Sequence, residues 1–165
     1  MRRGALAVVL VGACASTPPA AAPGPRIDLA LPALDGGTVE LSRYRGKPVV
    51  LHLFATWEAT ATADVDQLVE LHHAHGDDIT IVGIALDPDG HRLVAPWRRA
   101  LSVPYLVALA SQRVRSGTSA LGAIDTVPTT IVLDDRGRVL RRIERPLEIG
   151  EAAGFVRLVP ERRPG

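Results

Sequence analysis

Two long apolar runs separated by a stretch with helical spacing constrain the fold of this chain more than any other feature. The first run covers Val49 to Ala55, and the second lies within Asp77 to Leu86. Between them, Val65, Leu68 and Val69 recur at the spacing of one helix face. Near-continuous apolar runs are typical of strands buried on both faces. A helix that joins two such strands implies a parallel pair, so the sequence predicts an α/β domain.

The remaining predicted elements place this pair inside a mixed sheet. The turn Asp35-Gly36-Gly37 divides two extended segments between Arg26 and Leu41, which predicts an N-terminal β-hairpin. Further along we expect a helix over His91 to Leu101, a strand over Tyr105 to Ala108, a short helix over Gln112 to Leu121, strands over Thr129 to Leu133 and Arg138 to Ile143, and a helix over Glu148 to Val159. The closing strand pair is a hairpin, so the sheet combines parallel and antiparallel neighbours.

Length and charge limit the function classes. A chain of 165 residues with 47% hydrophobic and 22% charged residues is enough for one ordinary globular domain. Its net charge of +1 argues against nucleic-acid binding, which usually shows as a strongly basic stripe. We expect no nucleic-acid partner and no cofactor, and we expect a monomer.

The N-terminal residues have the layout of an export signal. Arg2 and Arg3 precede a short apolar run from Ala5 to Val11, which is too short for a permanent membrane span. Val11-Gly12-Ala13-Cys14 resembles a bacterial lipobox, in which the cysteine is acylated; the alternative is an ordinary signal peptide cut within the nearby Ala and Ser residues. The predicted organisation is a signal over 1–13, a lipidated Cys14 with a Pro/Ala-rich tether over 14–25, a domain over 26–160 and a frayed tail over 161–165.

Cysteine usage restricts the chemistry. Cys14 is the only cysteine in the sequence. If it carries lipid, the folded domain has no thiol, which excludes structural disulfides and intramolecular dithiol chemistry.

The order of elements and the residues at their junctions resemble the thioredoxin fold. The segments "LPALDGGTVELSRYRGKPVVLHLFATW", "ITIVGIALD" and "DTVPTTIVLDDRGRVL" are similar to the TlpA/ResA-like, AhpC/TSA-related membrane-tethered thiol–disulfide oxidoreductases. The resemblance covers about Ile27 to Val159. It implies a mixed central sheet flanked by helices, with the hairpin as an N-terminal extension.

This resemblance also implies where the redox site would lie. Glu58 stands at the position of the family's first cysteine and Ala61 at that of its second, so both sulfurs are missing. Trp57 precedes them. Pro128 matches the family's cis proline, and the backbone of Val127 would pair with an extended peptide.

Two further positions match the family's helix. Asp64 matches its downstream acidic residue, and Asp66 replaces its helix-kinking proline. We expect Thr60 or Thr62 to cap this helix.

Each candidate residue has a simpler interpretation. Pro128 could start a strand in a trans bond, Glu58 could be a solvated first-turn residue, and Trp57 could serve packing alone. We expect His52, inside the first apolar run, to be a buried histidine with a hydrogen-bond partner. His72, His73 and His75 are interpreted as solvated or half-buried, although a metal pair is geometrically possible for His72 and His75.

Three functional hypotheses follow. In the first, a lipid-anchored domain facing the periplasm or cell exterior binds an exported protein or peptide in a groove formed by Trp57, Glu58, Val127 and Pro128, with no catalytic residue. In the second, the protein is an oxidoreductase of the family, acting in thiol–disulfide exchange or an antioxidant role with thiols supplied in trans. The third is a metal-handling lipoprotein that uses His72 and His75.

Overall fold

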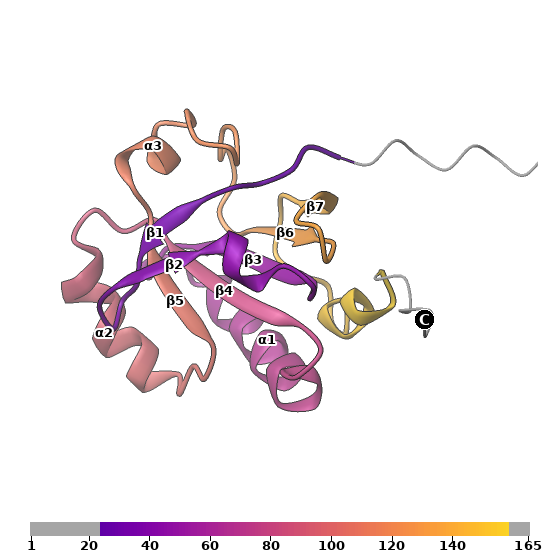
Figure 1. The fold of residues 1–165 in the computed structure, drawn as a ribbon. Coiled ribbons are helices and arrows are strands. Elements are labelled where there is room, and N and C mark those ends of the chain that lie inside the picture. Colours follow the sequence, from indigo (N-terminus) through magenta and orange to yellow (C-terminus); the bar gives the residue numbers. More distant parts are fainter. Residues whose placement is uncertain (1–23, 159–165) are drawn as a thin grey trace, which may run out of the picture.

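The computed structural model describes residues 24–158, drawn in Figure 1. The predicted signal over 1–13, Cys14, nearly all of the tether and the tail over 161–165 lie outside the described residues. No helix within residues 24–158 is both long enough and apolar enough to cross a membrane.

A five-stranded mixed sheet forms the centre of the domain, in the order β5-β4-β3-β6-β7. Its strands are β3 (Val49–Phe54), β4 (Thr80–Ala85), β5 (Leu106–Leu109), β6 (Thr129–Leu133) and β7 (Val139–Ile143). β3 runs parallel to β4 and antiparallel to β6. Every residue of β3 is buried, which explains why the run from Val49 lacks polar alternation.

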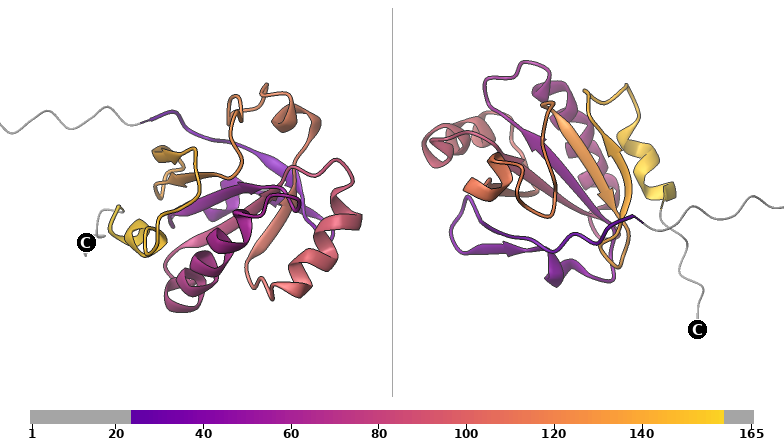
Figure 2. Two further views of the ribbon diagram at one scale, coloured as in Figure 1. Left: turned by 180° about the vertical axis from the view of Figure 1, so that it is seen from behind. Right: turned by 90° about the horizontal axis from the view of Figure 1, so that it is seen from above.

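The two faces of the sheet carry separate apolar cores. On one face pack α1 (Ala61–His75), α2 (Gly90–Ala100) and the 3-10 helix η2 (Ala152–Leu158). The other face is covered by α3 (Gln112–Arg115), the 3-10 helix η1 (Leu41–Tyr44) and the hairpin of β1 (Ala30–Pro32) and β2 (Thr38–Glu40). Figure 2 shows α1 and the hairpin on opposite sides of the strands. The predicted mixed sheet with flanking helices and an N-terminal hairpin is confirmed.

The N-terminal segment contacts both edges of the sheet. The Val139 N–H of β7 donates to the Pro25 carbonyl at 3.0 Å, and the Leu34 N–H donates to the Val107 carbonyl of β5 at 2.9 Å. The positive φ angles of Gly36 (94°) and Gly37 (78°) form the turn between β1 and β2. The segment therefore crosses one whole face of the sheet.

Two predicted helices are wrong in extent. The helix predicted over Gln112 to Leu121 ends at Arg115, because Gly117 takes a left-handed φ of 72°. The helix predicted over Glu148 to Val159 is the shorter 3-10 helix η2. Gly150 has a φ of 78°, which separates η2 from the loop before it.

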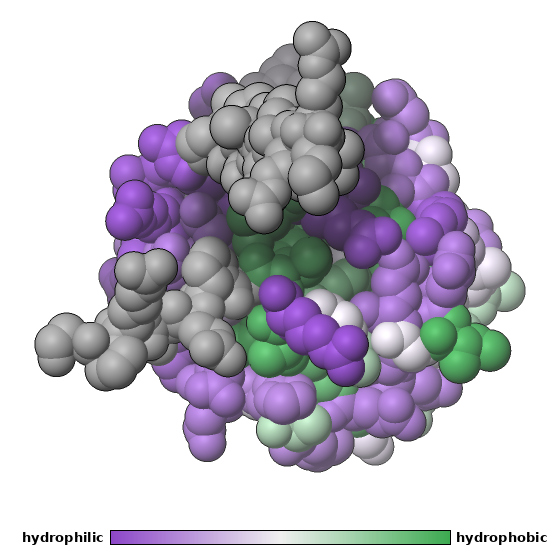
Figure 3. Space-filling view, turned by 90° about the vertical axis from the view of Figure 1, so that its right-hand side faces the viewer, coloured by the Kyte–Doolittle hydropathy of each residue, from purple (hydrophilic) through white to green (hydrophobic). Residues whose placement is uncertain are grey.

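The view in Figure 3 shows the side where β7 and η2 lie. Its surface is mainly hydrophilic, with hydrophobic residues gathered in a central hollow.

Candidate functional site

Three connections that are distant in sequence meet at one end of the sheet. Phe54, the last residue of β3, is paired with Ala85, the last residue of β4. Leu53 is paired with Thr129, the first residue of β6. The loops over 55–60, 86–89 and 124–128 therefore share this end, as the right-hand view of Figure 2 shows for the first and the third. We call it the loop end.

Asp87 fixes the loop that carries Trp57. Its side chain is 2% exposed, and its two carboxylate oxygens accept the Thr56 N–H at 3.2 and 3.3 Å. The Thr56 hydroxyl also donates to this carboxylate. The sequence alone assigns Asp87 no such role. A carboxylate directly after a buried strand, beside the end of its parallel neighbour, was the available signal.

Trp57 and Glu58 lie on the fixed loop, directly before α1. Trp57 is 63% exposed. One oxygen of Glu58 accepts the Thr60 hydroxyl at 3.2 Å and faces the Thr60 N–H at 3.5 Å. A carboxylate before the first turn of a helix interacts favourably with the helix dipole.

The predicted threonine cap is wrong. Thr60 occupies the N-cap position, but its side chain accepts no helix N–H. Its backbone is already helical, with φ −71° and ψ −21°, whereas a capping residue usually has an extended backbone. Thr62 lies within α1.

Ala61 is fully buried, whereas Glu58 is only partly buried. The Ala61 side chain is 0% exposed and belongs to the core between α1 and the sheet. Glu58 and Ala61, which the sequence resemblance aligns with two cysteines, therefore differ in environment: Glu58 is half-buried at the loop end and Ala61 lies inside the core.

Val127 and Pro128 lie beside this loop. The Val127–Pro128 peptide bond is cis, Pro128 is buried and Val127 is partly exposed. The Thr129 hydroxyl donates to the Thr126 carbonyl at 2.6 Å, which fixes the backbone on either side. Among residues 24–158, no hydrogen bond engages the Val127 N–H or carbonyl. This backbone is available to an external partner.

Asp64 is a buried acid on α1 near the loop end. Its side chain is 0% exposed, and Oδ1 accepts the Leu147 N–H at 2.9 Å. Oδ2 is buried and has no partner among the described residues. Burial raises the pKa of the Asp64 carboxyl, and the Leu147 N–H opposes part of that effect.

His52 is a buried histidine, as expected from the sequence. Its ring is 0% exposed, and Nδ1 lies 3.1 Å from the Thr130 hydroxyl. Nε2 has no partner among residues 24–158. Burial lowers the pKa of His52 to about 4, so the ring is neutral at pH 7.

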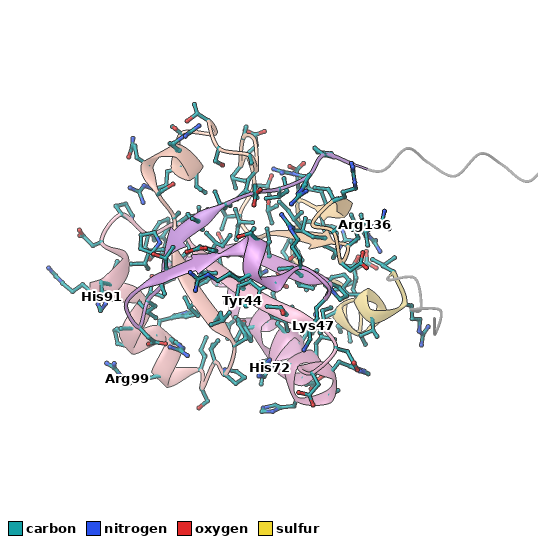
Figure 4. All side chains as sticks on the ribbon, viewed as in Figure 1. Tyr44, Lys47, His72, His91, Arg99 and Arg136 are labelled. Carbon is teal, nitrogen blue, oxygen red and sulfur yellow. The ribbon has the colours of Figure 1, made fainter. Side chains whose placement is uncertain are left out.

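The three histidines of α1 lie in its last turn. His72 lies edge-on to Tyr105, with ring centroids 6.3 Å apart, while His73 is exposed. Figure 4 shows His91 on α2, well separated from His72. Within residues 24–158, no group of three or more His, Cys, Asp or Glu side chains is placed to hold a metal ion.

Comparisons with known proteins agree with this architecture. The Redoxin family model matches residues 7–154. A DsbF homologue from Corynebacterium diphtheriae superposes with a TM-score of 0.71 at 25% identity, covering 81% of this chain and 85% of that one.

Two further solved structures are similar at lower identity. A thioredoxin-family thiol:disulfide interchange protein from Chlorobium tepidum has a TM-score of 0.69 at 24% identity, with coverage of 84% and 95%. A secreted Mycobacterium tuberculosis disulfide oxidoreductase homologous to E. coli DsbE has a TM-score of 0.67 at 18% identity, with coverage of 79% and 95%. The chain has a thioredoxin-like fold and belongs to the Redoxin family.

Proposed function

We propose that this protein is an exported, lipid-anchored, redox-inactive binding or scaffold domain of the cell envelope. It holds an extended peptide or an exported protein at the loop end. The observation that carries the proposal is that Cys14 is the only cysteine of the chain, so the segment from Trp57 to Ala61, which the resemblance aligns with the family's redox motif, contains no sulfur.

The loop end has no group that could exchange disulfides by itself. A thiolate is the nucleophile in thiol–disulfide exchange, and a carboxylate such as that of Glu58 does not replace it. Ala61 is buried and has no reactive atom. On this alignment, the chain lacks both the cysteine that would attack a disulfide and the cysteine that would resolve the mixed disulfide.

The features that support binding remain. Trp57 is exposed on a loop fixed by Asp87, and partly exposed aromatic side chains are common anchors of interfaces. The open backbone of Val127 supports strand-like pairing with an extended peptide. The partner is an exported peptide or protein, and we propose that the domain acts as a monomer.

The proposed location rests on the N-terminal sequence. Val11-Gly12-Ala13-Cys14 supports acylation of Cys14, with the domain facing the periplasm or the cell exterior. Among the similar solved structures, proteins from Mycobacterium tuberculosis and Corynebacterium glutamicum are described as secreted.

An insulin-reduction assay and a thiol-peroxidase assay test the absence of thiol chemistry. We expect the chain from Ala15 onward to show no turnover above a buffer blank. The control is the double variant Glu58→Cys with Ala61→Cys, which should form a disulfide if these positions match the family's site. Turnover by the thiol-free chain with a small-molecule thiol as donor would instead support the oxidoreductase hypothesis.

Binding is tested by capture of partners from envelope extract, with Trp57→Ala as the control. We expect at least one exported protein to be retained by the unmodified domain and lost with Trp57→Ala. Identical captured sets from the two proteins would contradict a groove at Trp57.

A further inference from the structure

One long segment of the chain carries positive charge alone. Residues 90–124 contain five arginines and neither Asp nor Glu, although the whole chain has 19 basic and 18 acidic residues. The segment comprises α2, β5 and α3, and β5 is an outer strand of the sheet. The positive charge is therefore concentrated along one edge of the domain, where it attracts groups of opposite charge.

Two of these arginines line a hollow at the end of α2. The hollow has a volume of about 450 Å³. Leu34 and Val103, both buried, supply part of its apolar lining. Its polar lining consists of Asp35, Arg98, Arg99 and Ser102. Since α2 starts directly after the 86–89 loop and its 11 residues span about 16 Å, this hollow is remote from the loop end.

The two arginines differ in what they contact. Arg98 is held in place, because its Nε donates to the Val103 carbonyl at 3.3 Å and its Nη1 donates to the Asp35 carboxylate. Arg99 is exposed, and its side chain forms no hydrogen bond or ion pair with any residue of 24–158. Figure 4 shows Arg99 extending from α2 away from the sheet. Its guanidinium is available to a partner.

Ser102 adds a hydroxyl to the hollow at a position that favours glycine. It follows the C-terminus of α2 and has a φ of 50°, the one positive φ of a residue other than glycine within residues 24–158. Glycine is the usual residue at such a position, because a side chain makes the left-handed backbone less favourable. The local backbone therefore does not explain the serine, whereas a polar lining of the hollow does.

Apolar side chains lie on the other side of Arg98. A smaller hollow of about 170 Å³ is lined by Arg98 together with Pro104, Tyr105 and Leu106. Leu106 is 38% exposed, and Pro104 is also exposed. Because Arg98 lines both hollows, they are neighbours. We call the surface formed by Arg98, Arg99, Ser102, Pro104 and Leu106 the α2–β5 surface.

The start of the described chain lies at the opposite edge of the sheet. The Pro25 carbonyl accepts the Val139 N–H of β7, and β7 and β5 are the two outer strands. With about 4.8 Å between neighbouring strands, these edges lie about 19 Å apart. Figure 1 shows α2 on the left and β7 on the right. A membrane anchor attached before Pro25 leaves the α2–β5 surface facing away from the bilayer, which favours a protein over lipid head groups as its occupant.

We propose that the α2–β5 surface is a second binding surface, and that its occupant is an acidic segment of an exported protein, in which Asp or Glu alternates with apolar residues. Arg98 and Arg99 bind the carboxylates, and the two hollows accept the apolar side chains. This inference goes beyond the proposed binding at the loop end and does not depend on it. It gives a scaffold domain two separate partners.

The test is selection of displayed random dodecapeptides on the immobilised Trp57→Ala protein, in which the loop end is impaired. Enriched peptides are synthesised, and their dissociation constants are measured by fluorescence anisotropy after Arg99→Glu or Asp35→Asn is added. Arg157→Glu is the matched control for the first change, since Arg157 is exposed on η2. Asp28→Asn is the control for the second, since Asp28 is exposed and pairs with Arg45 instead.

We expect the enriched peptides to combine Asp or Glu with apolar residues. Arg99→Glu should weaken their binding at least about tenfold, because repulsion replaces a charge-assisted contact. Asp35→Asn should tighten binding, because it removes the carboxylate that competes for Arg98. Arg157→Glu and Asp28→Asn should leave it nearly unchanged, and added salt should weaken it.

The serine provides a separate measurement. Ser102→Gly should unfold at a higher urea concentration than the unmodified protein, because glycine adopts the left-handed backbone more readily. The same variant should bind the acidic peptides more weakly. A variant that is more stable and binds as tightly would contradict the role of the Ser102 hydroxyl.

Three results would overturn the inference. The first is enrichment of basic or neutral peptides, and the second is equal binding by Arg99→Glu and Arg157→Glu. The third is cosedimentation with phosphatidylglycerol vesicles that Arg99→Glu alone abolishes, without enrichment of any acidic peptide, which would make the membrane surface the occupant. None of these results bears on the loop end, which capture with Trp57→Ala tests independently.

Discussion

At the scale of single residues, two buried ionisable side chains set the expected pH response. His52 on β3 and Asp64 on α1 are both 0% exposed, and each has one polar atom without a partner among the described residues. Burial favours the uncharged form of each, so it lowers the pKa of His52 and raises that of Asp64. The two groups therefore affect stability in opposite directions as pH falls.

For His52, we expect stability to fall as pH decreases from about 6.5 to about 4. In the unfolded chain the imidazole binds a proton near its ordinary pKa of 6.5, whereas in the folded domain it resists protonation until about pH 4. Over this pH range the free energy of unfolding should fall by about 3 kcal/mol in total, because each unit of pKa difference between the folded and unfolded chain corresponds to about 1.4 kcal/mol. Urea unfolding of the unmodified domain and of His52→Gln at several pH values measures it. An unchanged pH slope in the variant would contradict the assignment.

For Asp64, we expect Asp64→Asn to unfold at higher urea concentration than the unmodified domain at pH 7. The folded pKa is raised, so folding becomes less favourable as pH rises from the unfolded value of 3.8 through the folded value. Asparagine can still accept the Leu147 N–H, so the advantage should vanish at acid pH, where Asp64 is protonated. Asp66→Asn, at an exposed position on the same helix, is the control and should show a much smaller difference.

At the scale of elements, Arg142 on β7 holds the segment that leads to the loop end. Its Nη1 and Nη2 atoms donate to the carbonyls of Leu121 and Ala123 at 2.8 and 2.6 Å, and Nε donates to Glu144. These bonds attach the irregular chain after α3 to an edge strand. The position of Val127 therefore depends on a side chain two strands away from Trp57.

Arg142→Ala should lower the free energy of unfolding by about 1–3 kcal/mol, because charged donors are lost from the partly buried Leu121 carbonyl and the exposed Ala123 carbonyl. Amide hydrogen exchange over 121–127 should become faster. Arg141→Ala is the control, since Arg141 forms a surface ion pair with Glu151 that should contribute about 0–1 kcal/mol. Equal losses in the two variants, or unchanged exchange over 121–127, would contradict this role.

At the scale of the whole molecule, the N-terminal hairpin is part of the core. Ile27, Leu31 and Val39 pack with β3, β4 and β6 in one cluster, and all three are less than 5% exposed. Without this segment, one face of the sheet would expose apolar side chains to water. The hairpin predicted as an extension therefore completes the second of the two cores.

Leu31→Ala should lower the free energy of unfolding by about 2–5 kcal/mol, the range for a leucine removed from a packed core. Leu29→Ala, at a partly exposed position on the same segment, should lower it less. Chemical denaturation measures both. A small and equal loss in the two variants would show that the hairpin is dispensable for the domain.

Much of the architecture could be predicted because it depends on local patterns. The runs that became β3 and β4 are buried on both faces, and the turn at Gly36 and Gly37 needs positive φ angles that glycine favours. The lengths of α3 and η2 could not be predicted, because helical spacing continues past their ends while Gly117 and Gly150 adopt left-handed conformations. The role of Asp87 depends on a contact with Thr56, 31 residues earlier, which no local pattern encodes.

The sequence by itself determined the order of strands and helices and the absence of sulfur from the positions of Glu58 and Ala61, since both depend only on which residues occur and at what spacing. Only the tertiary structure decided that the loops carrying Trp57 and Val127 meet at one end of the sheet. The physical reason is that strand order and direction, which arise from pairing between distant segments, decide which loops meet. The same pairing buried Asp64 beneath the 144–150 loop and left Ile149 in water.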